Sequence, residues 1–291
     1  MNTVSTANSS TTTPPAAGGD PDGVVLEARS LVKEFRAAGG RRFGHAATFR
    51  AVDDVSFELR RGRTTALVGQ SGSGKSTVGR LMAQLHPLTS GEILLDGQPV
   101  HAVRGKAFTR YCGSVQMMLQ DPFASLNPLH RVEHVLGRVL RIHGHARTPE
   151  EVREQSLALL ERVNLRPSTR YLTRFPHELS GGERQRVSVA RALAAQPRVL
   201  LADEPVSMLD VTIRREILDL IDTLRREERI AVLYITHDLG SARAYSEETL
   251  VMYHGKVVER GPSEQVISDP QHEYTQRLLA ASPDPARRLA R

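Results

Sequence analysis

The sequence contains one cysteine and no tryptophan in 291 residues. A lone thiol, Cys112, excludes an internal disulfide bond and a metal cluster held by several cysteines. No apolar run approaches the roughly 20 residues of a membrane-spanning helix, and the longest runs, such as IAVLYIT, have the length of buried strands. The composition therefore indicates a protein of the reducing cytoplasm.

Acidic residues are in deficit, which leaves a formal net charge of +6. The basic residues are scattered, with one concentration from Arg36 to Arg63, whereas a nucleic-acid footprint is normally a clustered patch or stripe. We therefore expect no nucleic-acid partner. A surface that lies near anionic lipid headgroups explains the charge at least as well.

The first 22 residues lack the features of a folded or an exported segment. Ser, Thr, Pro and Gly dominate residues 1–22, and this composition predicts a disordered tail. The stretch has neither a basic start nor an apolar centre, so it does not resemble a secretory signal. Since 40% of the whole chain is hydrophobic, the remainder is sufficient for a substantial core.

From residue 24 onward, strands and helices alternate. Two strand patterns at 24–35 and 49–59 flank a Gly/Arg-rich break at 37–47. The strand TTALVG then leads into a glycine-rich loop and a helix from about Lys75 to Leu85, and GEILLDGQPV predicts another strand that ends at Asp96-Gly97. Further on, strands RVLLADEP and IAVLYITHD flank a helix near 210–227, and a final pair of strands covers 248–260.

Residues 129–168 differ, because their apolar positions recur at helical spacing. Thr148, Pro149 and Glu151 supply a cap, a first-turn proline and a capping-box glutamate for one of these helices. The fold class is therefore α/β, with a mostly parallel sheet covered on both faces, an antiparallel β part at the N-terminus and an inserted helical subdomain.

The segment GQSGSGKST follows a strand and opens a helix, and it matches the phosphate-binding P-loop pattern. Glycines let backbone amides wrap phosphate oxygens, Lys75 neutralises the terminal phosphates, and the Ser76 hydroxyl ligates Mg²⁺. The alternative is a glycine-rich turn between strand and helix. The residues of the motif that we expect to contact nucleotide are Gly69, Ser71, Gly72, Ser73, Gly74, Lys75, Ser76 and Thr77.

Two further strands end in polar side chains. Asp203 suits the metal shell, because Mg²⁺ prefers oxygen ligands, and Glu204 could polarise the water that attacks the γ-phosphate. His237 could reach the same phosphate. Taken singly, Asp203 could be a helix cap and His237 a satisfied core residue. Because open α/β sheets bind ligands at the carboxyl edge, we expect all three beside Lys75.

The stretch ELSGGERQRVSVARAL begins a helix with two glycines. Ser180 and Glu183 fit a capping box, but a cap has no use for Gly181 and Gly182, each of which costs roughly 1 kcal/mol in a helix. Bare backbone at a helix N-terminus binds anions. Since the P-loop already wraps one side of the phosphates, Ser180, Gly181 and Gly182 form a second candidate anion site.

These ordered motifs resemble those of the ATP-binding-cassette ATPases over about residues 24–262. LSGGERQR is similar to that family's signature and lies upstream of the LLADEP strand, as the family requires. The resemblance implies an ATPase domain at 23–262, with a helical subdomain at about 112–180 and a C-terminal extension at 263–291. It also implies that the signature contacts ATP held by a second ATPase subunit, so that two chains enclose two nucleotides.

Other roles follow from the same resemblance. Gln120, beside Asp121-Pro122, resembles the glutamine that senses Mg²⁺ and the attacking water, and Gln116 is a competing candidate. Asp210 resembles a residue of the loop that communicates across the dimer, although Met208 stands where alanine is usual. Phe35 lies where an aromatic residue stacks on adenine, but an ordinary edge-strand phenylalanine is an alternative.

The segments QDPFASLNP and PQHEYTQRLLAASP resemble the oligopeptide, dipeptide and nickel importer branch, with Glu273 in place of a proline. The resemblance implies a cytoplasmic-face, peripheral subunit that uses ATP and Mg²⁺. Its partners would be integral membrane permease subunits, a like ATPase subunit in a homo- or heterodimer and, indirectly, an extracytoplasmic solute-binding protein. The alternatives are a subunit of a sugar, metal or export transporter, and a soluble ATPase that acts on nucleic acid or ribosomes.

Overall fold

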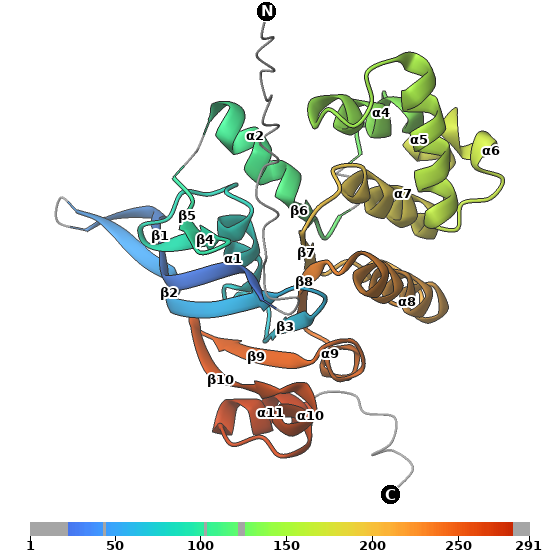
Figure 1. Ribbon diagram of the computed structural model, residues 1–291. Coiled ribbons are helices and arrows are strands. Elements are labelled where there is room, and N and C mark those ends of the chain that lie inside the picture. The colour runs from blue at the N-terminus through green and yellow to red at the C-terminus, as the bar shows by residue number, and fades with distance from the viewer. Residues whose placement is uncertain (1–22, 43–44, 102–103, 122–125, 282–291) are drawn as a thin grey trace, which may run out of the picture.

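The computed structural model describes residues 23–42, 45–101, 104–121 and 126–281, without the side chains of 37–47. The predicted N-terminal tail and the end of the C-terminal extension lie outside these ranges. The described chain forms two sheets, a helical lobe and a pair of C-terminal helices (Figure 1). None of its helices combines the length and the apolar character needed to cross a bilayer.

An antiparallel sheet of four strands forms the N-terminal part, as the sequence predicted. Its strands in spatial order are β2 (His45–Arg60), β1 (Val24–Arg42), β4 (Ser90–Leu95) and β5 (Gln98–Pro99). The predicted break at 37–47 is wrong in extent, because the β1 and β2 backbones stay paired as far as Arg42 and His45. The pairing resumes at Arg41 after a register shift that follows Arg36, despite the weak strand propensity of glycine.

The second sheet has six strands and is mostly parallel. Only β9 and β10 pair antiparallel, whereas the remaining neighbours run parallel. Residues of β3, β7 and β8 are all buried, which is typical of parallel strands covered on both faces. The strands in spatial order are β10 (Lys256–Pro262), β9 (Glu248–Tyr253), β3 (Thr64–Val68), β8 (Ala231–Thr236), β7 (Val199–Asp203) and β6 (Val115–Met118).

Alternate residues of the parallel strands enter different cores. Leu67 of β3 packs with α1 (Lys75–Met82), α2 (Gly105–Ser114) and the antiparallel sheet, while its neighbour Ala66 packs on the opposite face. Helices α8 (Val211–Glu228) and α9 (Leu239–Tyr245) lie beyond that opposite face. Helix α1 ends at Met82, earlier than the predicted Leu85, because Gln84 takes a left-handed φ of 55°.

The helical insertion forms a lobe whose core is shared with α7, α8 and residues of the main sheet such as Leu200 and Val232. It consists of α4 (Val132–Ile142), α5 (Pro149–Arg162), α6 (Ser168–Leu172) and the 3₁₀ turn η1 (Pro176–Glu178), and it is followed by α7 (Gly181–Leu193). The predicted start near residue 112 is too early. Strand β6 pairs with β7 inside the main sheet, so the insertion begins after Met118.

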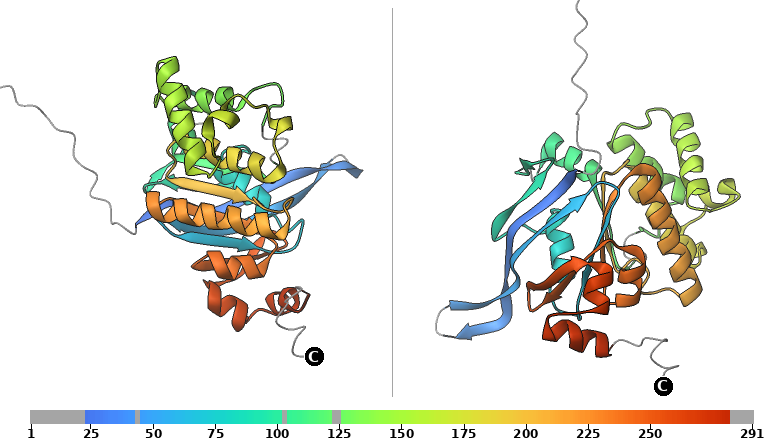
Figure 2. Two further views of the ribbon diagram at one scale, coloured as in Figure 1. Left: turned by 90° about the vertical axis from the view of Figure 1, so that its right-hand side faces the viewer. Right: turned by 60° about the horizontal axis from the view of Figure 1, so that its bottom comes forward.

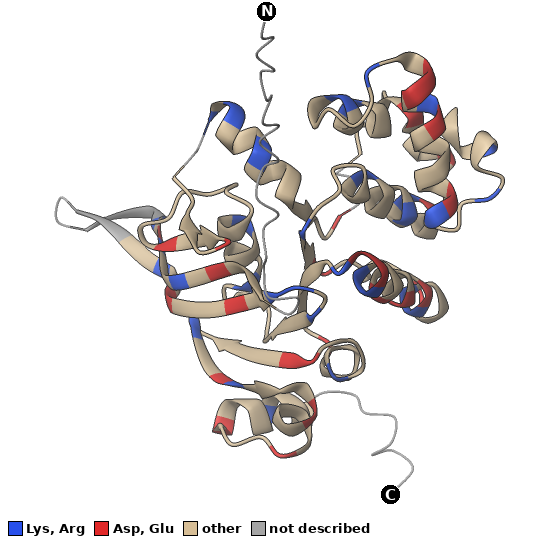
Figure 3. Cartoon of the chain, viewed as in Figure 1, with Lys and Arg blue, Asp and Glu red and all other residues tan. Residues whose placement is uncertain are grey.

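The C-terminal helices α10 (Ser263–Ser268) and α11 (Glu273–Ala281) pack on the β3 and β9 side of the main sheet. Two further views show these helices and the helical lobe at opposite ends of the molecule (Figure 2). Basic and acidic residues are interspersed along α8 (Figure 3). Pairs such as Arg226 and Asp222, 2.7 Å apart, account for part of this pattern.

Candidate functional site

The loop between β3 and α1 is held in an unusual backbone conformation. Gly69, Gly72 and Gly74 have φ values of 150°, 79° and 106°. A Cβ on Gly69 would lie 2.2 Å from the carbonyl oxygen of Met252, and one on Gly74 would lie 2.2 Å from that of Ala51. Glycine is therefore required here by conformation and by the close approach of other backbone segments.

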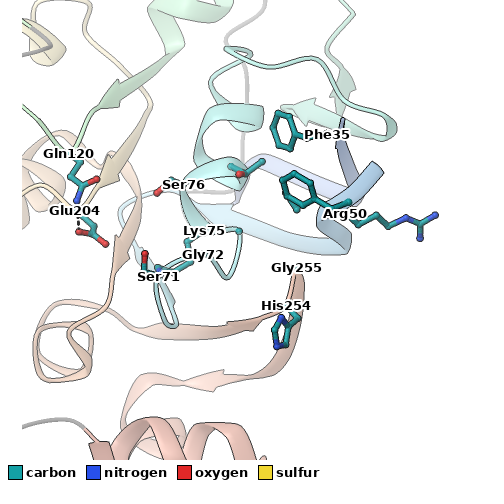
Figure 4. A pocket seen from close by; sticks show the side chains of 14 residues that line it. Phe35, Arg50, Ser71, Gly72, Lys75, Ser76, Gln120, Glu204, His254 and Gly255 are labelled. Carbon is teal, nitrogen blue, oxygen red and sulfur yellow. Dashed lines mark hydrogen bonds between the residues drawn. The ribbon is translucent and has the colours of Figure 1, made fainter. Parts of the chain in front are cut away.

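A pocket of about 510 Å³ opens beside this loop, within the range of small-molecule sites. Figure 4 shows the loop between Gln120 and Glu204 on one side and Phe35 and Arg50 on the other. The pocket thus contains nine of the candidate residues. These nine are Phe35, Ser71, Gly72, Gly74, Lys75, Ser76, Thr77, Gln120 and Glu204.

The Lys75 ammonium is 2.7 Å from the carbonyl oxygen of Gly69 and 2.9 Å from that of Gln70, and donates to both. The side chain is buried, and burial lowers the pKa of Lys75, whereas the charges of Glu204 and Asp203 act in the opposite direction. A cation held only by neutral carbonyls gains from an anionic ligand nearby. Lys75 is therefore suited to neutralise phosphate.

Asp203 is 1% exposed and accepts a hydrogen bond of 2.9 Å from the Ser76 hydroxyl. Burial raises the pKa of Asp203, although this hydrogen bond lowers it. A divalent cation would offset the desolvation cost of the buried Asp203 carboxylate. The Ser76 hydroxyl oxygen and the Asp203 carboxylate oxygens are of the kind that Mg²⁺ binds. The described residues hold no group of three or more His, Cys, Asp and Glu for a metal, so phosphate and water would supply the other ligands.

Glu204 lies between the two other polar groups predicted for the reaction. Its carboxylate accepts a hydrogen bond of 2.9 Å from the Gln120 amide and lies 3.3 Å from the His237 ring nitrogen. Its φ of 46° is rare for a residue with a side chain, and such backbone strain is common at active sites. The carboxylate is thus fixed from two sides at the edge of the pocket.

Ser73 is buried, and its hydroxyl oxygen has no hydrogen-bond partner in the described part of the chain. Unpaired buried hydroxyls are rare and costly. This orphan in the loop, together with the positive-φ glycines, fits a cradle for a polar ligand such as phosphate.

The signature residues lie elsewhere. Ser180, Gly181, Gly182 and Asp210 are not among the described residues that line the pocket. Ser180 accepts from the Glu183 amide and caps α7, as its capping box predicted, and Asp210 caps α8 by accepting from the Ile213 amide at 3.0 Å. The starts of α7 and α8 therefore lie together within one chain, where Gly182 approaches Ile213.

The structure adds an internal reason for one signature glycine. A Cβ on Gly182 would lie 2.7 Å from Ile213, whereas one on Gly181 would meet Leu209 at an ordinary 3.4 Å. Packing within the chain therefore requires Gly182, which the interpretation from sequence did not consider. Gly181 is not required by its own chain in this way.

Aromatic side chains line the outer part of the pocket. Phe35 stacks on Phe49, with ring centroids 5.8 Å apart, and Lys33 lies over the Phe35 ring. Phe49 is 54% exposed and Phe35 is half-buried. Either ring could receive a flat ligand, so the structure adds Phe49 to the single candidate from the sequence.

Several pocket residues carried no signal in the sequence. Arg50 and Ala51 come from β2, and His254 and Gly255 form the turn between β9 and β10. Only the His-Gly pair, a turn signal, could have drawn attention to this region. Of the two glutamines considered, Gln120 lines the pocket, whereas Gln116 in β6 donates to the carbonyl of Cys112.

Comparison with known proteins gives consistent results. A family model described as ABC transporter matches residues 52–207. The chain is 41% identical over 262 residues to the oligopeptide transport ATP-binding protein OppF of Bacillus subtilis. The matched region covers 90% of this chain and 83% of OppF.

Two further relatives are longer than this chain. It is 44% identical to the peptidoglycan transport ATP-binding protein YejF of Agrobacterium fabrum and spans 47% of that protein, with 89% of this chain covered. It is 42% identical to the glutathione import ATP-binding protein GsiA of Salmonella typhimurium, with 92% of this chain and 43% of that protein covered.

Solved structures share the fold. The dimeric post-hydrolysis structure of the ATP-binding cassette MJ0796 bound to ADP and Pi superposes with a TM-score of 0.69 at 27% identity, over 82% of this chain and 98% of the other. The structure of cbiO1 from Clostridium perfringens, at 24% identity and a TM-score of 0.72, covers 93% of this chain and 100% of that one. At that identity it supports the fold alone.

Proposed function

This chain belongs to the ABC transporter family, and on that premise we propose that it binds and hydrolyses ATP to drive an importer. The observation that carries the proposal is the meeting of three strand ends beside one pocket, which Lys75 and Glu204 line. Lys75 follows β3, Asp203 ends β7 and accepts from Ser76, and Glu204 comes next. His237 follows β8 and lies beside Glu204. This is the arrangement of positioned charge that phosphoryl transfer requires.

In this proposal the loop binds the phosphates through backbone amides and the Lys75 ammonium. Ser76 and Asp203 hold Mg²⁺, which when bound neutralises charge on the phosphate oxygens. Phe35 and Phe49 hold the base at the outer part of the pocket, where their rings already stack. The support for this division is the order of the groups along the pocket, from Phe35 to the loop to Glu204 (Figure 4).

Glu204 is proposed to accept a proton from the attacking water. Its carboxylate is held by the Gln120 amide and faces the His237 ring, so both oxygens are oriented before substrate arrives. Gln120 then keeps Glu204 in place, and His237 donates to the γ-phosphate. Orienting groups in advance lowers the barrier without reorganisation during the reaction.

A second ATPase subunit is proposed to complete the site. Ser180 and Gly181 are not among the described residues that line the pocket of their own chain. Packing within that chain does not require a glycine at position 181. The structure of MJ0796, a dimer bound to ADP and Pi, supports a dimeric assembly. Closure on ATP and reopening after hydrolysis would make turnover depend on the dimer, as in lid-gated enzymes.

The proposed solutes are oligopeptides, dipeptides or related molecules. The printed names of OppF and GsiA support this class, as do the peptide-importer-like segments near Gln120 and in the C-terminal extension. The chain would act at the cytoplasmic face of the cell membrane, attached through permease subunits that contact the helical insertion. A solute-binding protein on the other side of the membrane would deliver the solute.

The proposal is tested by Glu204→Gln. The substitution keeps the size and the hydrogen-bonding reach of the side chain but removes the base, so hydrolysis should fall by about 10²–10⁴-fold. ATP binding should stay within a few-fold of wild type. Because bound ATP is no longer consumed, gel filtration should show a dimer that forms only with nucleotide.

The matched control is Glu92→Gln, which neutralises a glutamate of β4 whose side chain is 45% exposed and 3.5 Å from Arg29. Glu92 is not among the described residues that line the pocket. It should hydrolyse ATP like wild type. Wild-type hydrolysis in Glu204→Gln would remove Glu204 from its role, and a wild-type chain that binds no ATP would overturn the proposed function.

A further inference from the structure

A side chain of the C-terminal extension contacts the phosphate-binding loop directly. The backbone N–H of Gln70 donates a hydrogen bond of 3.0 Å to the phenolic oxygen of Tyr274 in α11. Tyr274 is only 3% exposed, so water has little access to replace this partner. A contact between residues 204 positions apart in the chain thus reaches the loop that the proposed function depends on.

The contact acts on the same peptide group that holds Lys75. The peptide that joins Gly69 to Gln70 carries the Gly69 carbonyl at one end and the Gln70 N–H at the other. Its carbonyl accepts from the Lys75 ammonium at 2.7 Å, while its N–H donates to Tyr274. Because a peptide group is planar, fixing the N–H fixes the direction of the carbonyl.

Glycine makes this peptide easy to turn. Gly69 has a φ of 150°, and a residue without a Cβ rotates more freely than any other. The Tyr274 hydroxyl therefore restrains the Gly69–Gln70 peptide, which the backbone preference of Gly69 leaves free to turn. The carbonyl that it directs is one of the two that accept from the Lys75 ammonium.

The phenol is itself held from several sides. Its ring stacks on Tyr253 of β9, with centroids 4.0 Å apart, and its backbone N–H donates to the His272 ring at 3.1 Å. The carboxylate of Glu259 in β10 accepts from the amides of Gln271 and His272, at 2.7 and 3.1 Å, and so anchors the start of α11. These contacts hold the Tyr274 hydroxyl in one position relative to the loop.

We propose that Tyr274 is a positioning residue for nucleotide binding, which holds the Gly69–Gln70 peptide and, through it, the Lys75 ammonium in the arrangement that receives phosphate. This role rests on the proposed function. Without the hydroxyl, the loop samples further conformations, and apparent affinity falls with the fraction of loops that remain competent. The groups proposed for the chemistry, Glu204 and His237, lie on other strands and are unaffected.

The test is Tyr274→Phe in the full chain, because this change removes the hydroxyl and keeps the ring that stacks on Tyr253. Loss of one hydrogen bond of ordinary net strength corresponds to about a three- to tenfold change in an equilibrium. We expect the Kd and KM for Mg·ATP to rise by that factor while kcat stays within about twofold. In the nucleotide-free protein, the Gln70 amide should exchange its hydrogen faster.

The matched control is Tyr234→Phe, since Tyr234 is equally buried and its hydroxyl bonds to Ser241 at 2.9 Å, away from the loop. It should leave the KM for ATP and the Gln70 exchange unchanged. A Tyr274→Phe protein that matches this control in both measurements would overturn the positioning role alone. Absence of ATP binding in wild type would instead overturn the proposed function and, with it, this role.

Discussion

At the scale of single residues, the site keeps groups in states that a stability-optimised chain would avoid. Asp203 is a buried carboxylate whose pKa is raised by burial, and Ser73 is a buried hydroxyl without a hydrogen-bond partner in the described structure. Glu204 has a left-handed backbone. Such features lower stability, and they persist where a ligand or a reaction requires them.

Asp203→Asn should therefore stabilise the nucleotide-free protein while it abolishes hydrolysis. Because the pKa of Asp203 is raised in the folded chain, the folded state binds this proton more tightly than the unfolded state does. The charged group thus lowers stability once the pH has risen through the carboxyl range. We expect a gain of about 1 kcal/mol at neutral pH, measured by urea denaturation.

The gain should shrink as the pH falls through the raised pKa of the folded chain, and it should be absent below about 4, where the carboxyl is mostly neutral in both states. Asp54→Asn is the control, because Asp54 is exposed and its neutralisation should change neither stability nor hydrolysis appreciably. A destabilised Asp203→Asn protein at neutral pH would show that the buried charge is compensated within the chain.

At the scale of elements, two helices begin with the same device for different purposes. Thr148 heads α5 and Ser180 heads α7, and each forms a capping box with the glutamate three residues later. A cap is needed in both places because the first amides of a helix have no partner within it. Only the α7 start is also proposed to face a neighbour's nucleotide.

Ser180→Ala and Thr148→Ala separate these purposes. Each should lower the free energy of unfolding by about 1 kcal/mol, because each removes a cap. Only Ser180→Ala should weaken the ATP-dependent dimer, by about 1.5–3 kcal/mol for a lost hydrogen bond to a charged group. The measurement is dimer dissociation with ATP in a Glu204→Gln background. Equal dimer affinity in the two variants would reduce Ser180 to a cap.

At the scale of the whole molecule, the C-terminal helices are part of the ATPase domain rather than an appendage. Tyr274 and Leu278 of α11 share a core with Ala66 and Val68 of β3, the strand that leads into the phosphate-binding loop. The helical lobe packs at the other end around a different core. The helical lobe and α11 thus pack in different cores of the molecule.

Leu278→Ala tests this integration. Truncating a buried leucine should lower the free energy of unfolding by about 2–5 kcal/mol, and the loss should appear in a single transition that includes the ATPase domain. Arg277→Ala is the control on the same helix, because its side chain is 64% exposed. A separate early transition confined to α11, with the main transition unchanged, would show that the helix is an independent appendage.

Local chemistry allowed much of this to be predicted from the sequence. Glycine spacing, strand-end carboxylates and capping residues act over a few positions, so the P-loop, Asp203 and Glu204, and the caps at Thr148 and Ser180 could be identified before the structure. The mostly parallel sheet followed from the alternation of strands and helices. What failed were boundaries, at 37–47 and near 112, where backbone pairing extended or began a strand.

The sequence by itself thus determined which residues we propose to hold phosphate and metal, because such groups are specified by residue type and short spacing. Only the tertiary structure decided what supports them. The packing of Gly182 against Ile213, the approach of Ala51 to Gly74 and the bond from Gln70 to Tyr274 join distant segments. Such contacts depend on how whole elements pack, and a linear pattern carries no signal for them.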